Sequence, residues 1–199
     1  MELLKKIVSP FLFLIYKLIQ KKNWYWPNII AILKKRIVLV DRIPSCNQYT
    51  KYWGHGKLII GRQCEFGFKF GGRHRQGSIE LQPRYENSKI IISDNVSTNN
   101  NIFICAANHI EIGQSTLIGE GVTIMDHEAH AIDPKFRRQV GEIGKVKIGN
   151  NVWIGNNAII LKNTIIGDNT IVAAGAVVTG EFPSNVIIGG VPAKVIKDL

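Results

Sequence analysis

The chain has 199 residues, enough for one domain with a hydrophobic core and a short appendage. Its net charge of +10 is concentrated in residues 1–57, which carry 11 Lys and Arg against two acidic residues, whereas residues 58–199 carry 14 against 13. The nearly neutral body excludes a broad nucleic-acid-binding face, and the basic segment indicates an anionic surface as a partner. Three cysteines without a CxxC pair indicate reduced, cytosolic thiols rather than disulfides or a zinc site.

The first predicted unit is a basic, partly helical segment over residues 1–57. Lys17, Lys21 and Lys22 interrupt its apolar runs, and no uncharged run reaches the roughly 18 residues of a membrane-spanning helix. We predict one or two short amphipathic helices, with the aromatic residues 24–26 at an interface. Two interpretations remain: attachment to an anionic membrane surface, or packing of this arm on the following strands or on a neighbouring subunit.

The second predicted unit, residues 58–199, contains a repeat with a period of six. Such a period fits neither the 3.6 residues of a helical turn nor the two of a strand. It predicts a solenoid, whose repeats stack on one another and bury a shared core. The aliphatic positions of the clearest hexads are Ile148, Ile154, Ile160, Ile166, Val172 and Val178.

Three hexads make one triangular coil of parallel β-strands, with the aliphatic residues inside and Gly, Asn or Asp at the corners. The interior of such a prism is narrow, so any chemistry belongs on its outer surface or between neighbouring prisms. The pattern breaks after Ile124 and resumes in phase at Ile148. Residues 126–145 are therefore predicted to be an inserted loop that leaves the prism at a corner, and a long ordered loop on a regular scaffold is typically functional.

Three stretches together resemble the hexapeptide-repeat acyltransferases, above all the sugar and polysaccharide O-acetyltransferases: IGEGVTIMDHEAHAID from Ile118, VKIGNNVWIGNNAIIL from Val146, and IIGGVPAKVIK from Ile187. The resemblance implies an all-β, left-handed parallel β-helix with a short helical N-terminal segment and one extended loop. It also implies a homotrimer with sites between subunits and acetyl-CoA as co-substrate. The implied acceptor is a sugar hydroxyl of a cell-surface polysaccharide such as O-antigen or capsule, or of its precursor. We expect a cytoplasmic protein, at the inner face of the membrane if the N-terminal segment binds there.

Within the inserted loop, the resemblance implies that His127 is the general base, with His130 as the alternative. An alcohol is a poor nucleophile at neutral pH, and a neutral imidazole can take its proton and pass it to the leaving thiolate. Asp126 and Glu128 flank the histidine, but neighbours on a strand point to opposite faces, so neither is assigned as its orienting partner. The His-x-x-His pair lacks a third ligand, so no metal site is predicted.

The resemblance implies that coenzyme A lies along the outer edge between two prisms. Trp153 is expected to face the acyl and pantetheine groups, although it could instead be an aromatic residue of the trimer interface. The backbone amide of Asn156 is expected to stabilise the oxyanion. Backbone groups of Ala174 and Thr179 would contact the pantetheine arm, and Lys194 would meet a nucleotide phosphate.

For the acceptor, the resemblance assigns Asn99, whose alternative role is simply to form a turn. The acidic residue that binds the acceptor in the family corresponds to Ala106 or Ala107 here, which predicts an acceptor other than a simple galactoside. Two other activities on the same fold stay open: N-acetylation of an amino sugar and acetylation of an antibiotic. A hypothesis of a different class is a non-catalytic scaffold, which would not need the histidine-bearing loop or Trp153.

Overall fold

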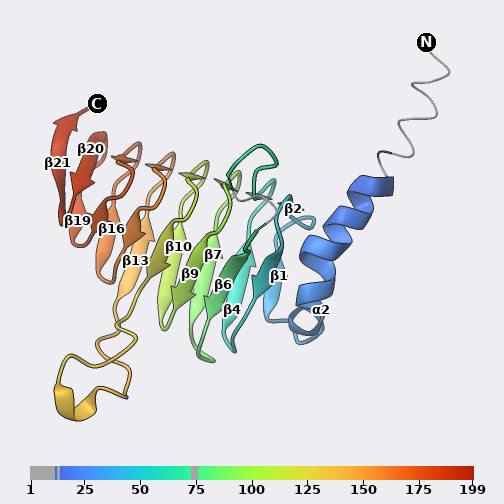
Figure 1. Cartoon of the computed structure of the whole chain (residues 1–199), viewed down its shortest axis with the longest axis horizontal. Coiled ribbons are helices and arrows are strands. Elements are labelled where there is room, and N and C mark those ends of the chain that lie inside the picture. The colour runs from blue at the N-terminus through green and yellow to red at the C-terminus, as the bar shows by residue number, and fades with distance from the viewer. Residues whose placement is uncertain (1–11, 13, 73–75) are drawn as a thin grey trace.

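The computed structural model describes residues 12, 14–72 and 76–199. Three sheets of parallel strands wrap around one core to form an elongated triangular prism (Figure 1). The chain passes from sheet A to sheet B to sheet C in each coil, so that strands three places apart in the chain pair with each other. Among the strands that the structure describes, only β21 is antiparallel to its neighbour. The predicted parallel β-helix is therefore confirmed.

The three sheets run along the length of the prism. Sheet A contains β1 (Ile37–Leu39), β4 (Lys57–Ile60), β7 (Lys89–Ile92), β10 (His109–Ile112), β13 (Lys145–Ile148), β16 (Thr164–Ile166) and β19 (Glu181–Phe182). Sheet B contains β2 (Ser45–Cys46), β5 (Glu65–Phe66), β8 (Ser97–Thr98), β11 (Leu117–Ile118), β14 (Trp153–Ile154), β17 (Ile171–Val172), β20 (Val186–Gly190) and β21 (Ala193–Asp198). Sheet C contains β3 (Thr50–Tyr52), β6 (Ile79–Pro83), β9 (Phe103–Ala106), β12 (Thr123–Met125), β15 (Ile159–Ile160) and β18 (Val177–Val178). We call the corners the A–B, B–C and C–A edges.

The prism begins earlier than the expected boundary between residues 57 and 58. The first coil consists of β1, β2 and β3, and Ile37 already pairs with Leu58 of the second coil. Hexads are not evident there because Cys46, Thr50 and Tyr52 fill inward positions that aliphatic residues occupy in later coils. The boundary expected from the sequence is corrected accordingly.

A helical cap covers the N-terminal end of the prism. Residues 14–20 are helical, η1 (Lys21–Tyr25) is a π-helical turn, and α2 (Trp26–Leu33) continues the helix. Trp24 is fully buried and stacks on Phe66, with a ring-centroid distance of 6.3 Å. Packing of the N-terminal segment on the first coils, one of the two interpretations, is thus observed for the described part, whereas residues 1–11 and 13 lie outside it.

The face of the cap that meets the prism also carries polar side chains beside Trp24. Gln20 accepts the N–H of Cys46 at 2.7 Å and donates to its carbonyl at 3.2 Å. Asn28 accepts the N–H of Tyr52 at 2.7 Å and donates to the carbonyl of Thr50 at 2.9 Å. These side chains satisfy backbone groups of the first strands, which no preceding coil covers.

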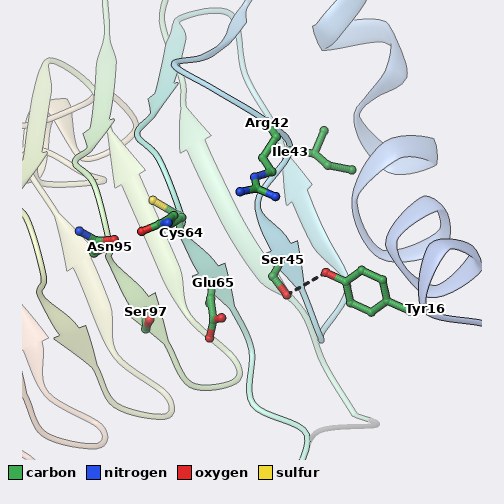
Figure 2. Close-up of a pocket in the computed structure, with 9 residues that line it drawn as sticks. Tyr16, Arg42, Ile43, Ser45, Cys64, Glu65, Asn95 and Ser97 are labelled. Carbon is green, nitrogen blue, oxygen red and sulfur yellow. Dashed lines mark hydrogen bonds between the residues drawn. The ribbon is translucent and has the colours of Figure 1, made fainter. Parts of the chain in front are cut away.

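The opposite face of the cap is apolar and exposed. Tyr16 marks the boundary between the two faces, because its hydroxyl reaches Ser45 Oγ at 3.4 Å beside a hollow formed by the cap and sheet B (Figure 2). None of the described helices is long and apolar enough to span a bilayer. The large exposed side chains of the cap are Leu12, Leu14, Ile15, Tyr16, Leu18, Tyr25, Trp26, Ile30 and Leu33.

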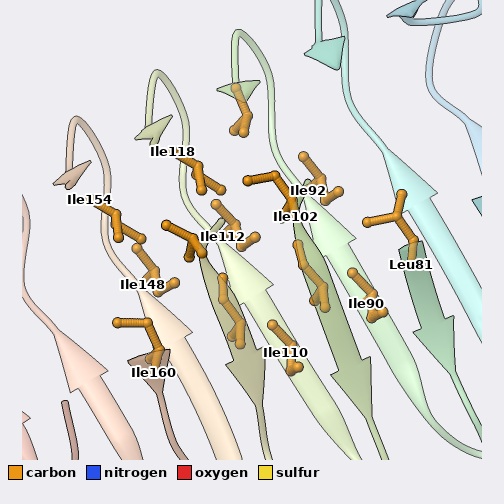
Figure 3. Close-up of a cluster of buried hydrophobic side chains, with 14 of the residues drawn as sticks. Leu81, Ile90, Ile92, Ile102, Ile110, Ile112, Ile118, Ile148, Ile154 and Ile160 are labelled. Atoms are coloured by element: carbon orange, nitrogen blue, oxygen red, sulfur yellow. The ribbon is translucent and has the colours of Figure 1, made fainter. Parts of the chain in front are cut away.

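The core consists largely of isoleucine and valine side chains, which stack on their counterparts in the next coil (Figure 3). Ile112 pairs with Ile148 across the inserted loop, and Ile148 pairs with Ile166 one coil later. The insertion therefore leaves the register intact. Burying each isoleucine contributes about 1.5–3 kcal/mol relative to an exposed side chain, so this repeated packing holds the prism together.

Turns at the edges are stabilised by side chains of the following coil. Asp168 Oδ1 accepts the N–H of Asn150 at 2.7 Å, and Asn150 Oδ1 accepts the N–H of Gln114 at 2.9 Å on the A–B edge. On the B–C edge, Asn156 Oδ1 accepts the N–H of Glu120 at 2.9 Å. Asn or Asp at this turn position thus satisfies a backbone donor that the strand ladder does not reach.

Residues 126–144, which we call the arm, leave the prism between β12 and β13 and project from the C–A edge (Figure 1). Backbone hydrogen bonds pair its two limbs, and η2 (Pro134–Phe136) forms the tip. At its root, Lys162 Nζ lies 3.3 Å from Glu128 Oε1 and 2.5 Å from Glu142 Oε2. The inserted segment is therefore an ordered extension anchored to the next coil.

Candidate active site

His127 and Asp126 form a buried pair on the C–A edge. His127 Nδ1 lies 2.9 Å from Asp126 Oδ1. The carboxylate also accepts the backbone N–H groups of Ala107, Asn108 and His109 at 2.7, 2.8 and 2.7 Å. Because this carboxylate oxygen accepts a hydrogen bond from the ring, the proton of a neutral imidazole resides on Nδ1, and Nε2 carries the lone pair.

The local chain geometry brings these two neighbours together. Strands β7 and β10 are offset by 20 residues in register, whereas β13 and β16 are offset by 18. The extra residues widen the turn at Ala107 and Asn108, so that its N–H groups converge on Asp126. The alternation rule that argued against Asp126 as the partner of His127 does not apply, because β12 ends at Met125 and the chain turns into the arm.

His127 Nε2 is buried and has no hydrogen-bond partner in the described part of the chain. Leaving a buried polar atom unsatisfied costs about 1–3 kcal/mol, so such an atom in a native structure needs an explanation. The backbone of His127 bridges Ile143 at the other limb of the arm. The pair therefore presents a basic nitrogen, oriented by a carboxylate, at the root of a protruding segment.

His130 has different surroundings. It is exposed on the arm, and its Nδ1 lies 2.9 Å from the carbonyl oxygen of Arg137. Within the described residues, no carboxylate orients the His130 ring. The same residues contain no group of three His, Cys, Asp or Glu side chains placed to hold a metal ion. The geometry therefore favours His127 over His130 as the base.

Three other predicted residues line one hollow on the B–C edge. Trp153 lies on the outer face of sheet B between Leu117 and Ile171, and 55% of its surface is exposed. Asn99 and Asn156 approach the same hollow, which has a volume of about 430 Å³. Asn99 Oδ1 accepts the N–H of the following residue at 2.8 Å, so Asn99 forms a turn as well as lining the hollow.

The backbone N–H of Asn156 has no acceptor among the described residues. At the preceding coil of this edge, the N–H of Glu120 is accepted by the side chain of Asn156. The corresponding residue of the next coil is Ala174, whose methyl group cannot accept a hydrogen bond. A backbone donor is therefore left available beside the hollow that Trp153 lines.

The remaining predicted residues are spread over the C-terminal coils. Ala174 is exposed in the B–C turn, and Thr179 is exposed in the C–A turn after β18. Lys194 is exposed on β21, opposite Gly189. Within one chain, the B–C hollow thus lies on a different edge from His127, and the roles of all these residues stay predictions.

A sequence model described as "Bacterial transferase hexapeptide (six repeats)" matches residues 145–180. The chain is also 39% identical to a putative lipopolysaccharide biosynthesis O-acetyl transferase, WbbJ, of Escherichia coli (strain K12), over 54% of this chain and 60% of that protein. Residues 145–180 thus match the hexapeptide-repeat transferase family, and the relative supports that similarity over about half of the chain. It spans little more than half the length of the first curated relatives that it matches.

Two solved structures share the fold. One is a polySia-specific acetyltransferase, NeuO, with a TM-score of 0.66 and 21% identity over 81% of this chain and 66% of that chain. The other is a galactoside acetyltransferase in complex with coenzyme A, with a TM-score of 0.52 and 23% identity over 92% of this chain and 77% of that chain. The left-handed winding of the β-helix, which the resemblance implies, is consistent with this shared architecture.

Sequence reasoning missed Asp126 as the partner of His127. A signal was present, because Ile104 and Ile110 follow the hexad spacing and the next inward isoleucine, Ile112, comes only two residues later. That change of phase marks the widened turn whose N–H groups the carboxylate collects. When a turn is widened in this way, an aspartate one coil later on the same edge is a candidate to accept its N–H groups. If that aspartate directly precedes a histidine, it is also a candidate to orient the imidazole.

Proposed function

We propose that this chain is an acetyl-CoA-dependent O-acetyltransferase that acts on a sugar hydroxyl, in a cell-surface polysaccharide or its precursor. The observation that carries the proposal is the buried Asp126–His127 pair with its unpartnered Nε2. The name of the E. coli relative supports the O-acetyl acceptor, and the coenzyme A complex of the galactoside acetyltransferase supports the donor.

In the proposed reaction, His127 Nε2 takes the proton of the acceptor hydroxyl as its oxygen attacks the thioester carbonyl carbon. Asp126 holds the ring and stabilises the imidazolium that forms. The N–H of Asn156 donates to the oxyanion. When the carbon–sulfur bond breaks, His127 returns the proton to the thiolate. Because Nε2 is closed to solvent in one chain, the arm must move to admit the acceptor.

The site is completed between subunits in this proposal. Within one chain, His127 lies on the C–A edge, whereas Trp153 and Asn156 lie on the B–C edge. A second prism whose B–C edge faces the C–A edge of the first brings the two halves together, and three such contacts close a homotrimer. The backbone of Ala174 and Thr179 and the ammonium group of Lys194 are then available along the outer coils for pantetheine and phosphate.

Incubation with acetyl-CoA and surface glycans should yield acetylated glycan by mass spectrometry, and Ala174→Asn should suppress this transfer. The new side chain would accept the N–H of Asn156, as Asn156 does for Glu120 one coil earlier. Loss of one oxyanion donor lowers kcat by about 10²–10³-fold. Ala174→Leu, which has a similar shape but no acceptor, is the matched control.

The leucine variant should keep most of the turnover, and both variants should show similar KM values for acetyl-CoA. If the asparagine variant turns over as fast as the unmodified protein, Asn156 is not the oxyanion donor. If no glycan is acetylated by the unmodified protein, the proposed activity itself fails.

We further propose that the helical cap rests on an anionic membrane surface, where a lipid-linked acceptor would be found. Its outward face is apolar, with Trp26 and Leu33 62% and 75% exposed, whereas its inward face carries Gln20 and Asn28 beside the buried Trp24. Lys21, Lys22 and Lys34 border this face, and residues 12–40 contain no acidic residue. Apolar side chains flanked by lysines match an acyl–headgroup boundary of negative charge.

Sedimentation with vesicles should show binding to phosphatidylglycerol-containing bilayers and weak binding to pure phosphatidylcholine. Replacing Trp26 and Leu33 by serine should weaken binding by more than about tenfold, because each burial contributes roughly 1.5–3 kcal/mol. Ile132→Ser, at a position 73% exposed on the arm, serves as the control. Equal binding by all variants would show that another surface meets the lipid.

A further inference from the structure

A second hollow lies on the C–A edge, on the N-terminal side of the Asp126–His127 pair. It has a volume of about 680 Å³ and opens at the turns that follow β3 and β6. None of the residues expected to bind donor or acceptor lines it. Its lining residues are Trp53, Gly54, His55, Gln82, Arg84 and Tyr85.

Neighbouring strands of sheet C connect this hollow to the buried pair. Gln82 pairs with Cys105, and Cys105 pairs with Met125, in one row across neighbouring strands. Burial raises the pKa of the Cys105 thiol to about 11, while the charge of Arg84 lowers it and that of Asp126 raises it, so both charges act on one side chain. Strands β6 and β12 are two spacings apart, or about 10 Å. That span exceeds one pyranose ring and suits a linked saccharide.

Two aromatic side chains line the hollow. Trp53 and Tyr85 are 58% and 42% exposed. Lys51 Nζ lies 4.1 Å from the centre of the Trp53 ring and lines a smaller hollow that shares this tryptophan. Exposed aromatic faces offer a flat apolar surface to the C–H groups of a sugar ring.

The hollow also offers an unneutralised cation. Arg84 Nε donates to Gln82 Oε1 at 3.4 Å, and Gln82 Nε2 donates to Glu80 Oε2 at 2.7 Å. No carboxylate forms an ion pair with Arg84 in the described part of the chain. A guanidinium with free terminal nitrogens is suited to bidentate recognition of a carboxylate.

We propose that this hollow binds a sugar ring of the acceptor that is linked to the reacting ring, and that it selects acidic saccharides. The ring stacks on Trp53 or Tyr85, and its carboxylate binds the Arg84 guanidinium. The acceptor thus lies along the C–A edge, from the hollow to His127. This inference rests on the proposed function for the identity of the reacting site, but the binding that it predicts does not require acetyl transfer.

The test uses the full chain and two probes, an oligogalacturonate and an oligosialate, each beside its carboxyl-reduced neutral form. Binding is measured by ligand-observed NMR without acetyl-CoA. At least one acidic form should bind about tenfold or more tightly than its reduced form. Arg84→Gln should abolish that preference, and Trp53→Ala should weaken binding of both forms. Arg62→Gln and Trp26→Ala, at exposed positions outside the hollow, are the matched controls, and thermal unfolding verifies the fold of each variant.

The proposal is overturned if neither acidic form is preferred, or if Arg84→Gln keeps the preference of the unmodified chain. Thermal stabilisation by acetyl-CoA separates the two hypotheses. A chain that acetyl-CoA stabilises but that shows no preference for acidic glycans fails this inference alone. A chain that binds acidic glycans through Arg84 but transfers no acetyl group fails the proposed function and leaves this site standing.

Discussion

His127→Ala should abolish acetyl transfer while leaving the prism folded. The imidazole is buried, its Nδ1 lies 2.9 Å from the Asp126 carboxylate, and its Nε2 has no partner among the described residues, so its removal leaves the acceptor hydroxyl without a base. General-base catalysis contributes about 10²–10⁴-fold, and turnover should fall by that factor. The measurement is the steady-state rate of coenzyme A release with a glycan acceptor.

The matched control is His130→Ala, since His130 is exposed and bonded within the arm. It should retain turnover within a few-fold of the unmodified chain. Both variants should still be stabilised by acetyl-CoA in thermal unfolding, because neither residue lines the hollow of Trp153. The reverse pattern, with His130 essential and His127 dispensable, would exchange their roles.

Asp126→Asn should lower turnover by up to about 10⁴-fold, through the ring of His127. The amide has one acceptor oxygen, whereas the carboxylate serves four donors. If the oxygen keeps the N–H groups of Asn108 and His109, the amide nitrogen faces His127 Nδ1. The imidazole then accepts at Nδ1 and carries its proton on Nε2, where the base is needed.

A tautomer change distinguishes this positioning role from a general loss of stability. Nitrogen-15 NMR should find the proton of neutral His127 on Nδ1 in the unmodified chain and on Nε2 in Asp126→Asn. Asp168→Asn, which alters a carboxylate that accepts a turn N–H on the A–B edge, is the control and should leave both tautomer and turnover unchanged. An unchanged tautomer in Asp126→Asn, together with lost activity, would contradict the mechanism.

The C-terminal half of the prism was predictable because its period is strict. Ile148, Ile154 and Ile160 each recur one coil later in register, as their spacing requires. The first coil could not be predicted from the sequence, since Cys46 and Tyr52 occupy inward positions without a recognisable repeat. A hexad is detected by its aliphatic residue, whereas burial at the capped end requires only a side chain that fills the space.

Part of the candidate site could likewise be predicted from the sequence, and part could not. The arm and His127 follow from a break in the period, and Trp153 and Asn156 follow from the resemblance of their hexads to a known family. Asp126 could not be assigned, because its direction depends on where β12 ends and on a turn that lies one coil earlier. The free N–H of Asn156 likewise depends on the residue stacked beside it, Ala174.

The amino-acid sequence by itself therefore determined the parallel β-helix, the place of its interruption and the histidine at that place, because hexads specify inward positions locally along the chain. Only the tertiary structure decided what Asp126 binds, which edge carries His127, and which face of the cap is apolar. Each of these depends on contacts between coils or on the packing of the cap against the first coil. Such contacts join residues distant in sequence, and no local pattern records them.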